Sequence, residues 1–323
     1  MSPNCERFLL VRNPHARGGA AHIADEVAAR IHGTGAAVDV FETAAPDETD
    51  PVPGLADTLS GHRSAAVVVV GGDGSARTVA EVVSRHLGTW PAGTPGGGTS
   101  PGTVPITIVP GGTGNSMFRA LWGDVAWQQA LGSVLEGRAA TRPIDLYRFV
   151  EAARAVLLGA STGFFRWTLD ATARFPELTG RELYTAAGTA VAQELVAYRG
   201  RVEVDDVTVA DGPIMLAAVG GAAHRSGTIH VLPGSELDDG RLDVCVLAVG
   251  TREEFFALMG KVVDGAHGGE PGVVLTRGRR VVLASDSGDL PFEHDGEIWR
   301  EHTGRVTIDV VPAAIDVTCP GAS

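Results

Sequence analysis

Lysine is nearly absent from this chain, and its scarcity removes several kinds of nucleotide site. Among 323 residues the single lysine is Lys261, and Val262 follows it. A Walker-type P-loop needs Gly-Lys-Ser/Thr, and a protein-kinase core needs a strand lysine and a His-Arg-Asp loop. Neither pattern is present. The dinucleotide fingerprint is also broken, because Arg77 follows Gly72 and Gly74 where a third glycine belongs.

Cysteine, long apolar runs and positive charge are scarce as well. The three cysteines, Cys5, Cys245 and Cys319, are isolated and show neither metal-ligand spacing nor a disulfide framework. No apolar run approaches the roughly 18–20 residues of a membrane span. The N-terminus lacks the charged-then-apolar pattern of a signal peptide. A net charge of -13 argues against nucleic acid as a partner. We therefore expect a cytoplasmic protein.

What the chain has instead is a glycine-rich turn after an apolar strand. Residues 67–70 are all valine, and Gly71-Gly72-Asp73-Gly74-Ser75 follows them, leading into apolar residues at helical spacing. This order predicts a buried parallel strand, a tight turn and a helix. Such a turn directs backbone N–H groups and a helix N-terminus at one point, which suits a phosphate.

A second stretch repeats this order. Residues 106–109 (Ile-Thr-Ile-Val) lead into Pro110-Gly111-Gly112-Thr113-Gly114-Asn115 and then into another helical segment. Parallel strands of one sheet end at the same edge, so we expect the two turns to meet there as a phosphate cradle. The pair predicts a nucleotide site. Alone, the second stretch fits an ordinary strand-to-helix turn equally well.

Asp73 lies among the predicted phosphate-binding amides. A carboxylate there repels a phosphate unless a divalent cation lies between them. Its presence therefore predicts Mg²⁺ bound with the nucleotide. The alternative is that Asp73 caps the helix that follows it, as aspartate often does.

Strand and helix patterns divide the chain into two domains, as its length favours. Up to about residue 145, apolar strands alternate with helical segments, which predicts a doubly wound parallel sheet. Residues 89–104, dominated by Pro, Gly and Thr, are expected to form a flexible loop. After residue 145, short strands follow one another with two helical interruptions, near 181–198 and 252–263. That texture predicts a β-rich second domain, a sandwich.

Further motifs accompany the two glycine-rich stretches in a fixed order along the chain. They are Asn13-Pro14, Thr43, Asp145 in Pro-Ile-Asp-Leu, the run 237–244 (Leu-Asp-Asp-Gly-Arg-Leu-Asp-Val) and Asp295-Gly296-Glu297. Together they resemble the catalytic domain of the diacylglycerol kinase superfamily, which includes bacterial lipid kinases, sphingosine kinases and ceramide kinases. The resemblance covers nearly the whole chain.

The resemblance implies an α/β fold with a doubly wound parallel-sheet N-terminal domain that binds ATP. A β-sandwich C-terminal domain, carrying much of a lipid cleft, follows it, and the last strand returns to the first domain. The implied limits are 1–142 with about 304–323 for the ATP domain and 143–303 for the lipid domain. The implied reaction is ATP- and Mg²⁺-dependent transfer of the γ-phosphate to a lipid hydroxyl, with diacylglycerol as the first candidate.

Motif matching also assigns site residues. Glu297 would accept the proton of the attacking hydroxyl, with Asp73 as the second catalytic residue. Asp239, with the backbone carbonyls of Glu236 and Arg241, would hold a second, structural Mg²⁺. The positions implied to line the nucleotide are Asn13, Thr43, Gly72, Asp73, Gly74, Ser75, Ala76, Arg77, Thr78, Gly112, Thr113 and Asn115.

The chemistry of Asp295-Gly296-Glu297 supports this assignment independently. A positioned carboxylate that removes a hydroxyl proton contributes typically about 10²–10⁴-fold to a rate. The glycine permits a turn that aims a carboxylate into a cleft. Asp-Gly is equally a strong hairpin signal, so an ordinary β-turn stays an alternative here and at Asp239-Gly240.

This sequence departs from the family pattern after the first glycine-rich stretch. Ser75 stands in place of a threonine and Arg77-Thr78 in place of Asn-Glu, so Glu81 is the candidate substitute carboxylate. Because the single lysine, Lys261, lies in neither glycine-rich stretch, the cations best placed to reach phosphate are Arg17, Arg77 and Arg119. These changes leave nucleotide affinity and metal geometry open.

Three functions therefore stand. The first is a lipid kinase that meets its substrate transiently at the cytoplasmic membrane face, without a transmembrane segment; its oligomeric state is open, a homodimer included. The second is an NAD-kinase-like or sphingosine-kinase-like enzyme. The absence of Asn-x-Gly-x-Leu-Gly-Phe counts against NAD, and Phe164-Phe165-Arg166-Trp167, which lacks an acidic residue, counts against an amino-lipid. Those side chains line an acyl-chain cleft or belong to the core. The third function is non-catalytic nucleotide or lipid binding.

Overall fold

The computed structural model describes residues 6–14, 19–44, 51–61, 65–90, 104–112, 114–225, 229–301 and 303–321. It divides into two compact units: unit 1 comprises Met1–Ile144 with Ala313–Ser323, and unit 2 comprises Asp145–Pro312. Both limits fall inside strands, β5 (Ala140–Phe149) and β16 (Arg305–Cys319), that continue from one unit into the other. The limits predicted from the sequence, 142 and about 304, differ from these because amino-acid composition does not change at a point inside a strand.

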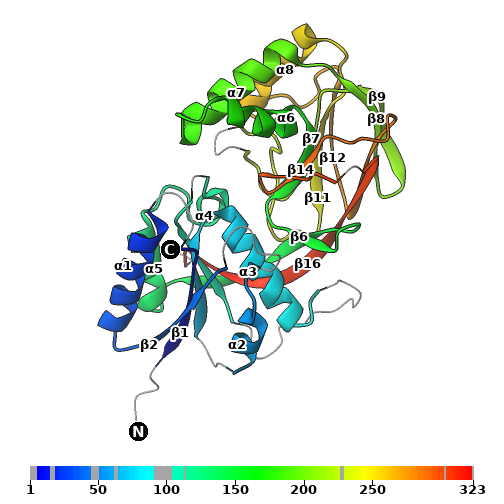
Figure 1. Cartoon of the computed structure of the whole chain (residues 1–323). Helices are drawn as coiled ribbons and strands as arrows, with labels where there is room; N and C mark the ends of the chain where they lie inside the picture. The colour runs from blue at the N-terminus through cyan, green and yellow to red at the C-terminus, as the bar shows by residue number, and fades with distance from the viewer. Residues whose placement is uncertain are drawn as a thin grey trace. The chain divides into compact units, whose positions relative to one another are not determined.

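Unit 1 is built on a parallel sheet with helices between its strands (Figure 1). The strands lie in the order β2 (Ala37–Glu42), β1 (Arg7–Arg12), β3 (Ala66–Gly71) and β4 (Ile106–Pro110), each parallel to its neighbours. The helices are α1 (Ala20–Gly33), α2 (Leu55–Gly61), α3 (Asp73–His86), α4 (Ser116–Trp122) and α5 (Trp127–Leu135).

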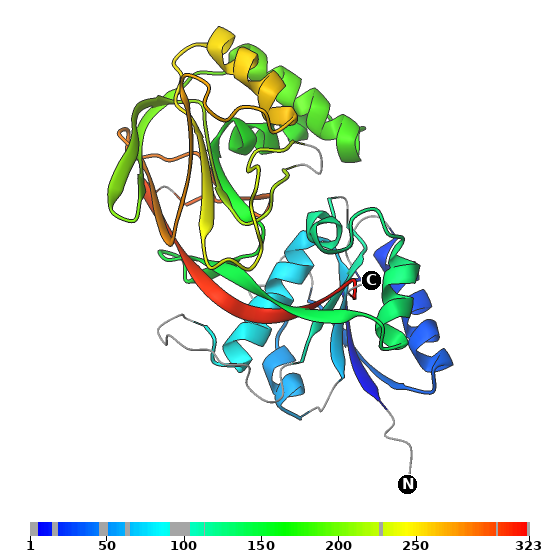
Figure 2. The ribbon, with the colours of Figure 1, turned by 180° about the vertical axis from the view of Figure 1, so that it is seen from behind.

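Burial explains why these segments take these forms. All six residues of β3 are buried, as a strand covered on both faces requires. Helix α1 buries Ala20, Ala24, Val27 and Ile31, which lie on one stripe at helical spacing. The predicted doubly wound domain is confirmed. The end of β16 pairs in parallel with β4 at Val317, which confirms the returning strand (Figure 2).

Unit 2 is a β-sandwich, also as predicted. One sheet has the order β12-β11-β10-β7-β14-β15, and the other places β16, β13, β8 and β9 side by side, with β5 and β6 attached. The strands not yet given are β6 (Arg154–Val156), β7 (Gly159–Gly163), β8 (Tyr198–Val204), β9 (Val207–Ile214), β10 (Leu216–Gly220), β11 (Leu242–Leu247), β12 (Val273–Gly278), β13 (Arg280–Ser285), β14 (Phe292–His294) and β15 (Glu297–Ile298).

Three helices pack on one sheet of the sandwich: α6 (Phe164–Ala171), α7 (Gly180–Glu194) and α8 (Arg252–Val263). The sequence missed α6, and it extended α7 too far. Helix α7 ends at Glu194 because Leu195 is extended, with ψ 128°, and Tyr198 already begins β8. The predicted loop at 89–104 lies mainly outside the described residues, apart from its ends.

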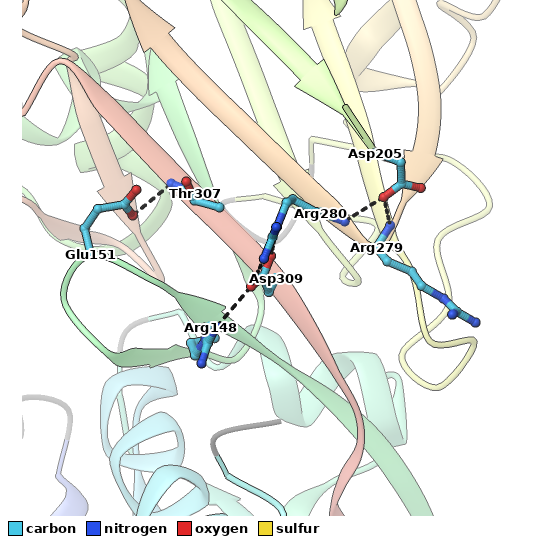
Figure 3. A network of polar contacts seen from close by, with 7 residues as sticks. All are labelled: Arg148, Glu151, Asp205, Arg279, Arg280, Thr307 and Asp309. Carbon is cyan, nitrogen blue, oxygen red and sulfur yellow. Dashed lines mark hydrogen bonds and ion pairs between the residues drawn. The ribbon is translucent and has the colours of Figure 1, made fainter. Parts of the chain in front are cut away.

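The carboxylate of Asp309 on β16 connects this strand of unit 2 to β13 and β5 through hydrogen bonds (Figure 3). Its carboxylate accepts hydrogen bonds from Arg280 Nε on β13 at 2.7 Å and from an Arg148 amino group on β5 at 3.1 Å. Burial acts to raise the pKa of Asp309, but the hydrogen bonds and charge of Arg280, joined by those of Arg148, outweigh it and hold that pKa below its usual value.

Two further carboxylates in Figure 3 accept backbone N–H groups rather than side chains. Asp205 Oδ1 accepts from Arg279 N at 2.8 Å and from Arg280 N at 2.9 Å. Glu151 Oε2 accepts from Thr307 N at 2.9 Å. In unit 2, carboxylates at turns therefore hold neighbouring backbone segments in place by accepting their N–H groups.

Candidate functional site

The two glycine-rich turns of unit 1 meet, as predicted. Strands β3 and β4 are parallel neighbours, and Gly111 N donates a hydrogen bond to Gly71 O at 2.8 Å. A Cβ on Gly112 would lie 2.5 Å from Gly72 Cα, closer than a side-chain carbon is ever found. Glycine is therefore required at this contact by the approach of two backbones.

The two turns use their amides differently. The N-cap of α3 is Gly72, a residue without a side chain that could cap the helix. Since the first N–H groups of a helix have no acceptor within it, those at the start of α3 are suited to an anion. The second turn closes on itself: Gly112 N donates to Asn115 Oδ1 at 2.9 Å, and Asn115 Nδ2 donates to Gly112 O at 2.7 Å.

Asp73 joins the two turns. Its Oδ2 accepts from Ser116 N and its Oδ1 from Met117 N, both at 2.9 Å, at the first turn of α4. Asp73 therefore caps α4. It does not occupy the N-cap position of α3, as the alternative from the sequence required, because that position is Gly72. The positive end of α4 supplies counter-charge to this carboxylate. The carboxylate of Asp73 therefore does not by itself require Mg²⁺ as a counter-charge. Support for a metal ion has to come from the oxygen atoms that would bind it.

Asn13 and Thr43 follow β1 and β2, at the same edge of the sheet as the turns. Asn13 Nδ2 donates to Ser75 Oγ at 3.4 Å. Thr43 N donates to Arg12 O at 2.9 Å, while its buried hydroxyl has no hydrogen-bond partner among the described residues. The carboxyl edge of a parallel sheet, where these groups lie, is where such folds bind ligands.

The remaining predicted positions lie within α3. Ala76 is a core residue and Arg77 is buried, while Thr78 Oγ1 donates to Gly74 O at 3.0 Å. The carboxylate of Glu81, the candidate substitute, accepts from Arg85 at 2.8 and 3.1 Å. Thr113 and Arg17 lie outside the described residues.

In unit 2, Asp295 and Gly296 form a two-residue turn between β14 and β15. Both have positive φ, 49° and 80°, and His294 pairs with Glu297 across the turn. This is the hairpin that Asp-Gly signals, with the φ signs of a type I′ turn. Glu297, half-buried, begins β15. The hairpin and a chemical role for Glu297 are compatible, because the turn itself presents that side chain.

Asp295 anchors the turn to the segment before β7. Its Oδ2 accepts from Leu157 N at 2.8 Å, and its Oδ1 accepts from Leu158 N at 2.7 Å and Gly159 N at 3.2 Å. Its own N–H donates to Gly159 O at 2.9 Å. No local sequence pattern indicates these bonds, since they join residues more than 130 positions apart.

The predicted metal loop is held by Asp145. Its Oδ2 accepts from Gly240 N and its N–H donates to Leu237 O, both at 2.7 Å. Asp239 accepts from Arg241 N at 3.0 Å and pairs with Arg277 at 3.2 Å. Among the described residues, no group of three or more His, Cys, Asp or Glu side chains is arranged to hold a metal ion.

The predicted donors, a carboxylate with backbone carbonyl oxygens, are of the kind that Mg²⁺ prefers. A side chain at Gly221 would collide with the Tyr147 hydroxyl and lie against the carbonyl oxygen of Glu236, so those two oxygens are neighbours. The Tyr147 hydroxyl is buried and has no hydrogen-bond partner in the described part of the chain. Burial raises the pKa of Tyr147, and the charges of Asp145, Asp243 and Asp239 add to this.

The segment Phe164-Phe165-Arg166-Trp167 divides between core and surface. Phe164 and Phe165 belong to the core between the helices and the sheet. Arg166 pairs with Asp170, and Trp167 borders a cavity of about 330 Å³ between α6 and α7. That volume is near the lower end of the roughly 300–1,000 Å³ typical of small-molecule sites. The cavity is lined by Trp167, Asp170, Ala171, Arg174, Val191, Glu194, Leu195 and Val196.

Two family models match the chain. Residues 7–149 match the diacylglycerol kinase catalytic domain, and residues 161–319 match the YegS C-terminal NAD kinase beta sandwich-like domain. A diacylglycerol kinase of Mycobacterium tuberculosis is 27% identical over 319 residues, covering 97% of this chain and 95% of that protein. A Pseudomonas aeruginosa protein named probable lipid kinase YegS-like is 27% identical over 261 residues, covering 80% of this chain and 78% of that protein.

Solved structures share the fold. A diacylglycerol kinase of Bacillus anthracis aligns with a TM-score of 0.68 at 14% identity, over 97% of this chain and 96% of that one. An NAD kinase of Archaeoglobus fulgidus, solved in complex with ATP, aligns with a TM-score of 0.50 at 12% identity, over 97% and 93%. With both family models matched, this chain belongs to the diacylglycerol kinase catalytic-domain superfamily and is a kinase.

Proposed function

We propose that the chain transfers the γ-phosphate of ATP to the hydroxyl of a lipid, with diacylglycerol as the first candidate. The observation that carries this proposal is the contact of the two glycine-rich turns beside the N-terminus of α3, whose N-cap is Gly72. The lipid class is supported by the names of the relatives, diacylglycerol kinase and lipid kinase.

In this proposal the nucleotide phosphates bind the backbone amides of residues 72–75. The unpartnered Thr43 hydroxyl and the Asn13 side chain, at the same sheet edge, are suited to the rest of the nucleotide. The remaining proposed contacts are Ala76, Arg77, Thr78, Gly112, Thr113 and Asn115. Amides fixed by strands and helices stabilise phosphate charge without reorganising, which is the main demand of phosphoryl transfer.

We further propose Mg²⁺ at two places. One ion accompanies the nucleotide, where its charge shields the phosphates from Asp73. The other is held by Asp239 with the carbonyl oxygens of Glu236 and Arg241, and it stabilises their loop. The clustering of oxygen donors around Tyr147 and Glu236 supports the second site.

Glu297 is proposed as the group that accepts the proton of the attacking hydroxyl. It begins a strand directly after a turn that Asp295 anchors with accepted hydrogen bonds, so its backbone is well fixed. A fixed carboxylate within reach of the hydroxyl proton is what general-base catalysis needs.

The lipid acceptor is proposed to be taken from the cytoplasmic membrane face by transient, peripheral association. Among the described residues, no helix is both long enough and apolar enough to cross a bilayer. The α6–α7 cavity, with Trp167, Val191 and Leu195 in its lining, is the candidate site for part of an acyl chain. A homodimer remains open.

A non-catalytic nucleotide or lipid sensor is the second candidate. This candidate is favoured because both carboxylate oxygens of Asp73 accept hydrogen bonds from amides of α4, which gives that carboxylate a structural role instead of a catalytic one. Turnover decides between the two candidates.

The test supplies the purified chain with Mg-ATP and mixed micelles of diacylglycerol, ceramide or sphingosine, with NAD as a separate acceptor. We expect ATP-dependent phosphorylation of diacylglycerol that stops when EDTA removes Mg²⁺. Nucleotide binding without phosphorylation of any acceptor would favour the sensor. Transfer to NAD alone would overturn the lipid assignment.

A further inference from the structure

A buried carboxylate lies behind the turn that carries Glu297. Glu293 on β14 is only 4% exposed, and Ser161 on β7 is fully buried. The Ser161 hydroxyl donates to Glu293 Oε1, and Gly296 N donates to Glu293 Oε2 at 3.0 Å. One side chain thus connects the turn to the neighbouring strand of the sheet.

Both bonds are donated to Glu293, which suits its ionised form, and a guanidinium supplies counter-charge. Burial raises the pKa of Glu293, and the charge of Arg225 opposes that rise. Arg225 is itself fixed: one of its amino groups donates to Val219 O at 3.1 Å and lies where a side chain on Gly159 would collide with it. The charge of Arg225 therefore acts on Glu293 from a fixed position.

Different carboxylates hold the two halves of the turn. Asp295 has φ 49°, a left-handed conformation that a type I′ turn requires and that aspartate adopts more readily than most residues. Asp295 holds the first half of the turn through the amides of residues 157–159. The Gly296 amide donates to Glu293 Oε2, and this bond fixes the second half, directly before Glu297.

We propose that Glu293 is a positioning residue: by holding the Gly296 amide against β7 through Ser161, it fixes the direction in which the Glu297 carboxylate points. This inference rests on the proposed function, in which Glu297 accepts the proton of the lipid hydroxyl. Glu293 itself is buried beneath the turn and does not touch the reactants.

Two conservative variants separate position from charge. Glu293→Gln keeps the length of the side chain, so its amide oxygen still accepts from Gly296 N while its amide nitrogen donates to Ser161 Oγ. Glu293→Asp keeps the charge opposite Arg225 but is one methylene shorter, and it loses one of the two bonds. Positioning predicts that the Gln variant works better than the Asp variant, whereas a role of charge predicts the reverse order.

The kinetic test measures kcat and the KM for ATP of both variants with the lipid acceptor at saturation. We expect Glu293→Asp to lose about 10²-fold in kcat, because small displacements of a reacting group cost that much. We expect Glu293→Gln to stay within about threefold, since both hydrogen bonds are re-formed. The KM for ATP stays unchanged in both. Glu301→Gln, at an exposed glutamate, is the matched control. Equal kcat values for the Asp variant and the parent chain would overturn the proposal.

A second readout does not depend on kinase activity. Hydrogen–deuterium exchange of the peptide spanning residues 292–299 reports on the Gly296 amide directly. Glu293→Asp should speed its exchange at least about tenfold, and Glu293→Gln should leave it near the parent rate. If the chain phosphorylates no acceptor, the proposed function fails while this measurement still tests the turn. Unchanged exchange in the Asp variant would remove Glu293 as the support of the turn.

Discussion

Asp73 in unit 1 and Asp295 in unit 2 are each followed by a glycine, and the two carboxylates have the same structural role. Each carboxylate accepts backbone N–H groups from a distant segment: Asp73 from α4, 43 and 44 residues away, and Asp295 from residues 136–138 positions away. They differ in what lies beside them. The amides at the start of α3 lie beside Asp73, whereas the half-buried side chain of Glu297 lies beside Asp295.

The aspartate of an Asp-Gly turn is therefore not necessarily the residue of that turn that binds a ligand or takes part in a reaction. In unit 1 the backbone is suited to bind a ligand, and in unit 2 a neighbouring side chain is suited to move a proton. In both, the aspartate converts a flexible glycine turn into a fixed one. The predictions below separate the aspartates from the groups that they position.

The largest effect is expected at Glu297, the side chain that the unit 2 turn presents. Glu297→Gln should lower kcat by about 10²–10⁴-fold, because the amide cannot accept the hydroxyl proton. Nucleotide affinity and the unfolding midpoint should remain those of the parent chain. Steady-state kinetics and a nucleotide titration measure both, and near-normal turnover would remove Glu297 as the base.

The next effect is expected at Asp295. Asp295→Ala leaves the amides of Leu157, Leu158 and Gly159 without their acceptor and should lower the free energy of unfolding by about 3 kcal/mol. Because the turn loses its anchor, kcat should fall as well, with the KM for ATP unchanged in the folded fraction. Urea unfolding followed by tryptophan fluorescence measures the first. A variant as stable as the parent chain would contradict the anchoring role.

A smaller loss of stability is expected at Asp73. Asp73→Ala removes the cap of α4 and should cost about 1–2 kcal/mol. Here the loss should appear in nucleotide affinity and turnover, because the side chain that ties the first turn to α4 is gone. Asp73→Asn retains one acceptor oxygen and should show a lesser effect in a nucleotide titration. Full affinity in the alanine variant would separate the turns from the nucleotide site.

The smallest effect concerns Asp309, whose carboxylate fastens side chains rather than backbone. Its folded pKa is lowered, so its contribution to stability is present above the unfolded value of about 3.9 and is lost as pH falls through the folded pKa. Asp309→Asn should therefore be less stable than the parent chain near neutral pH and should lose less stability on acidification. Urea midpoints between about pH 2.5 and 6 test this; parallel curves would contradict it.

Local patterns were enough to predict the turns and both fold classes. An apolar run followed by glycines predicts a buried strand and a tight turn, and β3 and β4 both have this form. The order of motifs then identified the superfamily. Which residues bind nucleotide, metal or proton stays a prediction from those motifs.

The supporting contacts were not predictable, because they join segments far apart in the chain. Nothing near Asp73 signals a cap on α4, and nothing near Glu293 signals Ser161, 132 residues earlier. Helix α6 was missed because its short run of aromatic residues fitted a cleft equally well. Its Phe164 and Phe165 are buried in a cluster with residues of α7, α8 and the sheet, which the sequence near them does not indicate.

The path of β16 has a consequence for the order of folding during synthesis. The residues that pair with β4, around Val317, are translated after the whole of unit 2. A nascent chain that has released residues 1–144 still exposes the flank of β4 and must wait for the final segment before that edge is covered. Unit 2, although later in the sequence, is complete in its own chain before unit 1 is.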